Sequence, residues 1–201
     1  MFKNIGALVA VVLSSNAMAS DLSDALEKDL AKTFSDSEIR FALGKSSADI
    51  NYGGENEVNA DVDSIGIALR NNLTKEWASE IKYTVEGEDN QLMQDGEVSR
   101  FDMTSTLSLS GIYKHNTIAG FTPYIKLGVG VINADFEGFG SVKEFTYVAG
   151  AGIDYAMSEI ITLGAEYEYF GEIDFSDEIG ESFSIGEMDM SRISLGLSVS
   201  F

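Results

Sequence analysis

Charged residues at alternate positions are the strongest chemical signal in this sequence. One residue separates Glu80 from Lys82, and one separates Glu166 from Glu168. Successive side chains of a β-strand point to opposite faces, so this spacing places both members of each pair on one face. Carboxylates and amines that converge there can form ion pairs, pass ions, or act as acid and base. Which of these three roles applies depends on the secondary structure and fold that position the residues.

Composition narrows the partners and the cellular context. The 201 residues have a formal net charge of −20, which makes nucleic acid and anionic membrane surfaces poor partners. Cysteine is absent, so disulfides cannot stabilise the chain and a lipid-modified N-terminal cysteine is excluded. The single histidine, His115, falls in a predicted turn, and Asp102, Ser105 and their neighbours show no triad spacing.

From residue 38 onward the chain alternates apolar and polar residues, which predicts strands. We expect eight of them, at residues 38–46, 62–70, 76–86, 99–114, 121–132, 145–155, 160–170 and 190–201. No later apolar run reaches the length of a spanning helix, so any membrane crossing must use strands. The fold class that we predict is all-β, an eight-stranded antiparallel up-and-down transmembrane β-barrel.

The connections between these strands alternate in length. The long ones are residues 47–61, 87–98, 133–144 and 171–189, and the short ones are 71–75, 115–120 and 156–159. Residues 48–61, 87–98, 133–144 and 171–189 hold 18 acidic residues and one basic residue, Lys143. Long loops on one side and tight turns on the other are typical of outer-membrane barrels.

Aromatic residues gather at both ends of the predicted outward faces. Five fall at the short-turn end: Trp77, Tyr113, Phe121, Tyr155 and Phe201. Five fall toward the long-loop end: Tyr83, Phe101, Phe145, Tyr147 and Tyr169. Two aromatic girdles fit the two interfaces of a bilayer, whereas a soluble sandwich would concentrate its aromatics in mid-strand.

The N-terminal region predicts an exported chain. Lys3, an uncharged run over residues 5–13 and the sequence Ala17-Met18-Ala19 are the three parts of a secretory signal peptide, with cleavage after Ala19. A membrane anchor is the alternative, but the apolar run is about half of the ~20 residues that a spanning helix needs. We therefore divide the chain into a signal peptide (1–19), a leader (20–37) that is a short amphipathic helix or a mobile segment, and a barrel (38–201).

The last strand completes the pattern. Residues 193–201 are apolar at every second position, and Ser194, Gly196, Val199 and Phe201 resemble the signal that the barrel-assembly machinery reads. With the signal peptide and the alternating loops, residues 38–201 resemble the small eight-stranded outer-membrane barrels of the OmpA, OmpX and opacity type. The resemblance implies the outer membrane of a Gram-negative cell. It departs from full-length OmpA in lacking a peptidoglycan-binding domain, so no cell-wall tether is implied.

Closing such a barrel would gather the inward charges in one lumen. The predicted set is Arg40, Arg70, Glu80, Lys82, Arg100, Asp102, Lys126, Glu166, Glu168 and Arg192. Eight strands enclose only enough space for their own side chains, so we expect a paired plug. The alternative is a gate, in which Glu80 or Glu166 exchanges between Arg192 and Lys126 to pass small ions.

The expected function is structural and concerned with surface interaction, including adhesion, without enzymatic activity, cofactor or metal. A narrow passive channel is the alternative, and a lipid A-modifying enzyme is a second one; His115 has no serine beside it to match the outer-leaflet lipid hydrolases. The expected partners are outer-membrane lipid, lipopolysaccharide and, through the acidic loops, a host surface or a phage. A divalent cation could bind the densest acidic group, which is Glu172, Asp174, Asp177, Glu178 and Glu181. Apolar loop residues suit either surface contact or loop packing: Ile50, Tyr52, Leu92, Met93, Phe136, Phe139, Phe175 and Phe183.

Overall fold

The computed structural model describes residues 36–52, 56–87, 89–94, 97–136, 140–174 and 185–201. Within these, the side chains of residues 50–52, 56–60, 89–94, 97–104, 135–136, 140–142, 172–174 and 185–187 are not part of the description. The predicted signal peptide and nearly all of the predicted leader lie outside the described residues. The strands are β1 (Ser37–Tyr52), β2 (Asn56–Asn72), β3 (Trp77–Glu86), β4 (Asp89–Gln94), β5 (Glu97–Lys114), β6 (Phe121–Phe136), β7 (Gly140–Ala156), β8 (Ile161–Asp174) and β9 (Ile185–Ser200).

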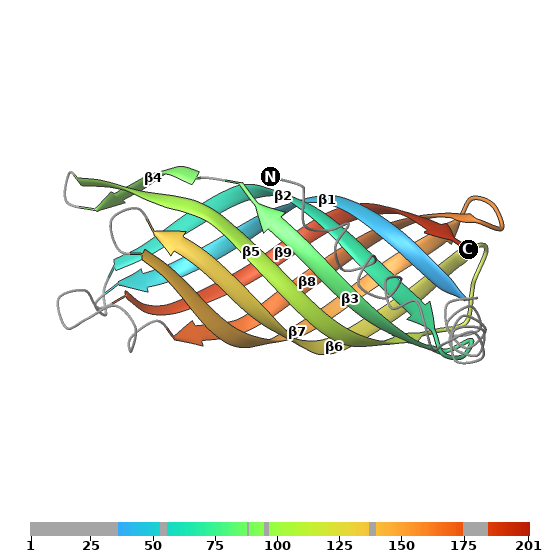
Figure 1. The fold of residues 1–201 in the computed structure, drawn as a ribbon. Coiled ribbons are helices and arrows are strands. Elements are labelled where there is room, and N and C mark those ends of the chain that lie inside the picture. Colours follow the sequence, from blue (N-terminus) through green and yellow to red (C-terminus); the bar gives the residue numbers. More distant parts are fainter. Residues whose placement is uncertain (1–35, 53–55, 88, 95–96, 137–139, 175–184) are drawn as a thin grey trace, which may run out of the picture. The chain divides into compact units, whose positions relative to one another are not determined.

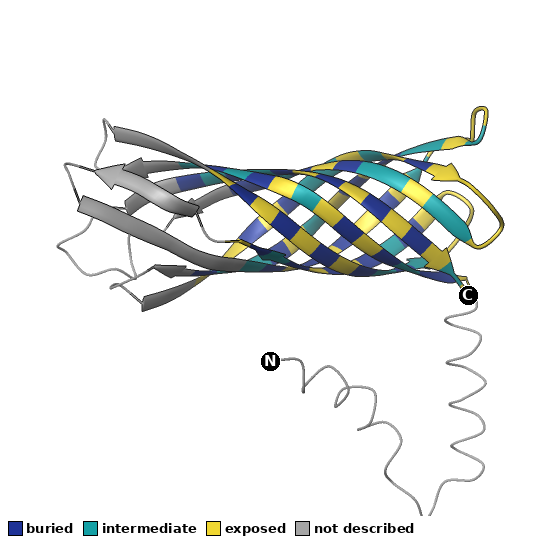
Figure 2. Cartoon of the chain, turned by 90° about the horizontal axis from the view of Figure 1, so that it is seen from above, coloured by how far each residue is buried: buried dark blue, intermediate teal, exposed yellow. Residues whose placement is uncertain are grey.

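Burial alternates along the strands, with apolar residues outside and polar residues inside (Figure 2). Leu43, Leu127 and Leu195 are 66–68% exposed, whereas Arg70 and Glu168 are fully buried. A soluble protein shows the opposite pattern, because water favours charged groups at the surface. An apolar exterior around a polar interior is what lipid favours in a transmembrane barrel.

Antiparallel pairing closes the sheet on itself (Figure 1). β1 pairs with both β2 and β9, and the ring is completed by β3 and β5, with Tyr83 opposite Leu107. Among the described residues, β4 pairs with β5 alone, beyond the point where the β3–β5 ladder ends. β3 and β4 are therefore successive parts of one strand position in the barrel wall. The predicted eight-stranded antiparallel up-and-down barrel is confirmed.

The predicted strand ends are wrong at the long-loop side. β1 and β2 pair as far as Tyr52 and Asn56, and β6 and β7 as far as Phe136 and Gly140, so most of the predicted loops 47–61 and 133–144 is strand. β4 lies in the predicted loop 87–98 and was missed. Asp, Asn and Gly disfavour strands on average, but a ladder already aligned by its neighbours overrides that preference.

Side-chain hydrogen bonds hold two of the short turns. In the β2–β3 turn the Thr74 hydroxyl accepts hydrogen bonds from the backbone N–H groups of Glu76 and Trp77. In the β7–β8 turn the Ser158 hydroxyl does the same for Ile160 and Ile161. These hydroxyl turns satisfy donors that the ladder leaves free, as the tight predicted connections require.

Aromatic rings pair at both ends of the outer face. Trp77 and Tyr113 lie 5.1 Å apart between ring centroids, and Phe121 and Tyr155 lie 4.8 Å apart, both at the short-turn end. At the long-loop end, the ring centroids of Tyr147 and Tyr169 lie 6.2 Å apart, and the Tyr169 hydroxyl donates to Asp189 over 2.7 Å. Within the described residues, no helix is long and apolar enough to cross a membrane.

Closure between β1 and β9 depends on a glycine. Gly44 lies opposite Ser194, and a Cβ at Gly44 would clash with the Ile193 carbonyl oxygen and lie 2.9 Å from the Ser194 Cβ. We predict that Gly44→Val lowers the free energy of unfolding by about 1–3 kcal/mol, the usual effect of overpacking. Urea unfolding in lipid vesicles, followed by the fluorescence of the only tryptophan, measures it. Leu43→Val, a change in the outward-facing neighbour, is the matched control, and equal stability of the two variants contradicts the prediction.

Candidate functional site in the barrel lumen

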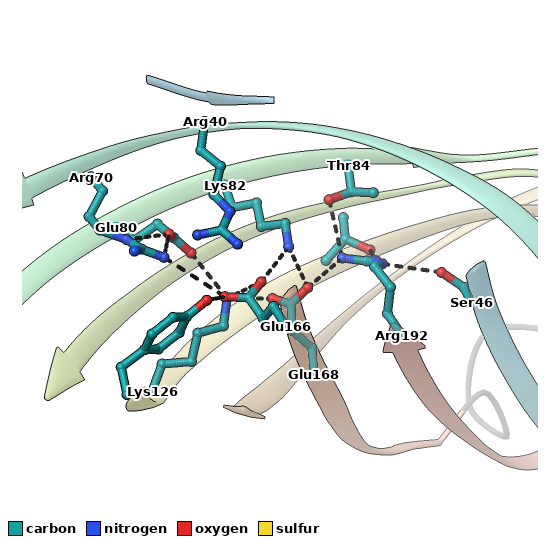
Figure 3. Close-up of polar contacts among 12 residues, drawn as sticks. Arg40, Ser46, Arg70, Glu80, Lys82, Thr84, Lys126, Glu166, Glu168 and Arg192 are labelled. Carbon is teal, nitrogen blue, oxygen red and sulfur yellow. Dashed lines mark hydrogen bonds and ion pairs between the residues drawn. The ribbon is translucent and has the colours of Figure 1, made fainter. Parts of the chain in front are cut away.

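The structure brings eight of the ten predicted lumen residues together, from six strands (Figure 3). Each is at most 3% exposed: Arg40, Arg70, Glu80, Lys82, Lys126, Glu166, Glu168 and Arg192. The side chains of Arg100 and Asp102, in β5, lie outside the described residues. Alternation along the strands positions the eight, because each occupies an inward-facing register position.

Two lysines and three glutamates form the centre of the network. The Lys126 ammonium lies 3.0 Å from Glu80, 3.2 Å from Glu166 and 2.6 Å from Glu168. The Lys82 ammonium lies 2.8 Å from Glu166 and 2.5 Å from Glu168. Neighbouring carboxylates of like charge are tolerated here because each contacts at least one cation within hydrogen-bonding distance.

Arginine pairs extend the network toward the short turns. Arg70 donates from Nε to a Glu80 oxygen over 2.9 Å, and its Nη1 donates to Asp154 over 2.8 Å. The other Asp154 oxygen accepts a 2.8 Å hydrogen bond from Arg40. Asp154 thus bridges two guanidinium groups, which would otherwise repel each other in a buried site.

Arg192 carries the network toward the long loops. Its guanidinium pairs with Glu86 and lies 3.2 Å from Glu168, and its Nε donates to the Ser46 hydroxyl over 3.1 Å. The guanidinium carbon also lies 4.8 Å from the ring centroid of Phe170. A planar cation stacked on an aromatic ring keeps its edge free for these hydrogen bonds.

Sequence reasoning missed several members of the network. Asp154, Glu86 and Glu38 are buried and pair with lumen arginines, and the Tyr124 hydroxyl donates to Glu166 over 2.8 Å. All four occupy inward-facing positions, so the alternation of side chains along each strand is enough to place them in the lumen.

Glycines on the inward faces leave space for the long cationic side chains. A Cβ at Gly164 or Gly196 would clash with the Arg40 guanidinium group. A Cβ at Gly150 would lie 3.0 Å from the Lys126 side chain. Arg40 and Lys126 therefore fit across a narrow barrel because β7, β8 and β9 are bare at these points.

An apolar layer fills the lumen near the long loops. Six inward-facing residues are at most 7% exposed there: Val62, Ile132, Val148, Phe170, Met188 and Met190. The predicted lumen set comprised only charged residues and did not include this layer. Buried apolar side chains and the charged network therefore both occupy the lumen of the described barrel.

The charges of the described network balance. Six cationic residues (Arg40, Arg70, Lys82, Lys114, Lys126 and Arg192) face six anionic ones (Glu38, Glu80, Glu86, Asp154, Glu166 and Glu168), so the net charge of these described residues is zero. His115 is exposed in a short turn, away from the network. Among the described residues, no group of three or more acidic, histidine or cysteine side chains could hold a metal ion. The predicted cation-binding group that begins at Glu172 lies outside the described side chains.

A sequence comparison decides the family. The family model described as "Outer membrane protein beta-barrel domain" matches residues 5–201. The chain belongs to this family. Members of the outer membrane β-barrel family reside in the Gram-negative outer membrane, which places this chain there. A search of curated protein sequences gave no match.

Solved structures share the fold at low sequence identity. Neisserial surface protein A is 18% identical with a TM-score of 0.56, covering 81% of this chain and 97% of its own. Outer membrane protein AlkL is 18% identical with a TM-score of 0.60, covering 83% and 90%. OprG from Pseudomonas aeruginosa is 16% identical with a TM-score of 0.51, covering 84% and 97%. At these identities the likeness concerns the fold alone.

The predicted assembly signal lies on or next to the closing strand β9. Ser194 and Gly196 face the lumen, Val199 faces outward, and Phe201, directly after β9, is 58% exposed. β9 pairs with β1, so these residues border the line along which the barrel closes. Their recognition by the assembly machinery stays a prediction.

Removing one arginine should reveal the strength of the network. We predict that Arg70→Met lowers the free energy of unfolding by about 3–5 kcal/mol, because Glu80 and Asp154 lose a shared cation in a buried site. Adding Glu80→Gln should recover part of this loss. Urea unfolding in vesicles measures both variants, with Lys75→Met in an exposed turn as a control expected within about 0.5 kcal/mol of the parent. A loss for Arg70→Met no larger than the control's would show that the pairs contribute no net stability.

Proposed function

We propose that this outer membrane β-barrel protein is a non-enzymatic surface protein with a closed lumen, and that its long hairpins contact partners outside the cell. The ion-pair network carries the proposal. Its charged groups bind one another across the full width of the barrel, and the eight predicted members are at most 3% exposed. A lumen filled in this way serves the stability of the wall and leaves interaction to the outside.

Opening the lumen would be energetically costly. Separating one buried ion pair costs about 3–5 kcal/mol when a charge is left unpaired. An ion path would have to part several pairs around Lys126 and also hydrate the apolar layer near Met188 and Phe170. These two barriers support a plug over a channel.

The charge distribution supports a role outside the membrane. The lumen network is neutral, so the net charge of −20 comes from elsewhere, and 18 acidic residues belong to the long-loop side of the sequence. β1 and β2 stay paired to Tyr52 and Asn56, which holds this side away from the barrel on paired hairpins. The partners that we propose are lipopolysaccharide and a host-cell or phage surface.

A gated channel is the second candidate. Among the described residues, several buried polar atoms have no hydrogen-bond partner, including the Arg40 Nε and Nη2 and the Glu86 Oε2. Unused hydrogen-bonding capacity could stabilise a second arrangement of the pairs, which is what a gate needs.

Conductance separates the plug from the gate. In planar bilayers we expect no resolvable current steps from the natural chain or from Glu80→Lys, because the apolar layer remains in both even though the substitution disrupts ion pairs. Folding of each protein is verified by the change of gel mobility on boiling. Current steps in the natural chain, with an ion preference that Glu80→Lys alters, would establish the channel instead.

Adhesion tests the surface role. Residues 50–58 are replaced by Asn-Gly, a two-residue turn that joins the paired residues Asp49 and Asn59. In a non-adherent Gram-negative strain, the natural chain should raise attachment to cultured epithelial cells and the shortened hairpin should abolish that gain. Lys75→Met, on the short-turn side, should attach like the parent. Equal attachment by the parent and the shortened chain at equal surface levels rejects this hairpin as the contact.

A further inference from the structure

An exposed ion pair interrupts the apolar outer face on β1 and β2. Lys45 and Asp63 lie opposite each other on these strands and point away from the lumen. The Lys45 ammonium lies 3.8 Å from the Asp63 carboxylate, and the side chains are 78% and 86% exposed. On the outside of a transmembrane barrel, such a pair marks either the edge of the lipid or a defect in the band that lipid covers.

Hydrogen bonds across the lumen give the level of this pair. Ser46, the neighbour of Lys45, accepts from Arg192, which also donates to Thr84 and Thr106 and pairs with Glu168. These residues therefore lie at a similar height in β1, β9, β3, β5 and β8. On the short-turn side, where Lys45 lies relative to Ser46, the outward-facing neighbours on the other four strands are apolar or aromatic and 44–64% exposed: Tyr83, Leu107, Tyr167 and Ile193. Four strands thus present apolar or aromatic side chains near the height at which β1 and β2 present charges.

The apolar band is correspondingly short on these two strands. On β1 it comprises Ile39, Phe41 and Leu43, four residue steps or about 13 Å of strand. On β7 the outward series runs from Phe145 to Tyr155, ten steps or about 33 Å. With a strand tilt of about 40°, these lengths become heights of about 10 Å and about 25 Å. The β7 value matches a typical barrel, and the β1 value is less than half of it.

From this mismatch we infer that the outer leaflet is thinned beside β1 and β2, and that hydrated lipid headgroups contact this flank from Lys45 and Asp63 upward. The polar surface continues from the pair toward the long loops through Ser47, Asp49 and Asp61. A second copy of the chain is a poor occupant, because in a twofold symmetric contact these aspartates would face the same aspartates of the other copy and repel them. Hydrated headgroups fit better, because their layer contains water that solvates the carboxylates and phosphate that can pair with the Lys45 ammonium.

Spin labels at matched heights test the inference. The chain has no cysteine, so single-cysteine variants can be labelled directly. Lys45→Cys and Asp63→Cys probe the flank, and Leu107→Cys and Tyr167→Cys are the controls at the same level. In vesicles with a hydrocarbon core of about 30 Å, labels at 45 and 63 should collide several-fold more with a water-soluble nickel complex than with oxygen. The controls should show the reverse preference. Oxygen preference at 45 and 63 would overturn the inference, and so would protection from both reagents, which indicates a protein neighbour.

A double substitution gives a second readout. Lys45→Leu with Asp63→Leu extends the apolar band of the flank without touching the lumen. Its urea midpoint should rise relative to the parent in vesicles of long-chain lipid and stay unchanged in thin, short-chain vesicles, where no thinning is needed. Equal shifts in both lipids would overturn the inference, because stability would then not depend on bilayer thickness.

Discussion

The closed backbone ladder between β1 and β9 is the constraint on which the other features depend. Lipid offers no hydrogen bonds, so every strand edge within the membrane has to be paired within the protein. The ladder from Glu38 opposite Ser200 to Asp49 opposite Asp189 completes that pairing. Gly44 allows β1 to approach Ser194 closely at this line, so a single missing side chain contributes to the closure of the whole wall.

Closure also determines what the lumen can hold. Once eight strands form a ring, half of their side chains share a narrow interior that lipid and bulk water do not reach. Charged residues there have to find partners inside the ring, which explains why Asp154 bridges Arg40 and Arg70 and why Lys126 contacts three glutamates. Neutrality of the network follows from the same requirement, because an excess charge would stay unpaired in a buried site.

The sequence allowed the sidedness of the strands to be predicted, because alternation is a local property. Alternation along the strands was enough to place Glu80, Glu166 and Arg192 in the lumen, and it places Asp154 there too. It could not give their partners, since these depend on the tilt of strands that lie far apart in sequence, as for Lys82 and Glu166. Ladder length was also beyond a local reading. β4 and the outer parts of β1 and β2 are strands because of their neighbours, although their composition favours loops.

Height in the membrane was the least predictable property, and it links the lumen to the lipid. Residues opposite each other in the ladder differ in height because the strands are tilted. The alternating pattern of β1 therefore does not show that Lys45 falls at the level of Leu107 on the far side of β3. Arg192 provides that comparison, because one guanidinium group bonds residues of β1, β3, β5 and β8. The interior network thus shows that β1 presents a charge at the height where other strands present apolar residues, which the alternation along any single strand does not show.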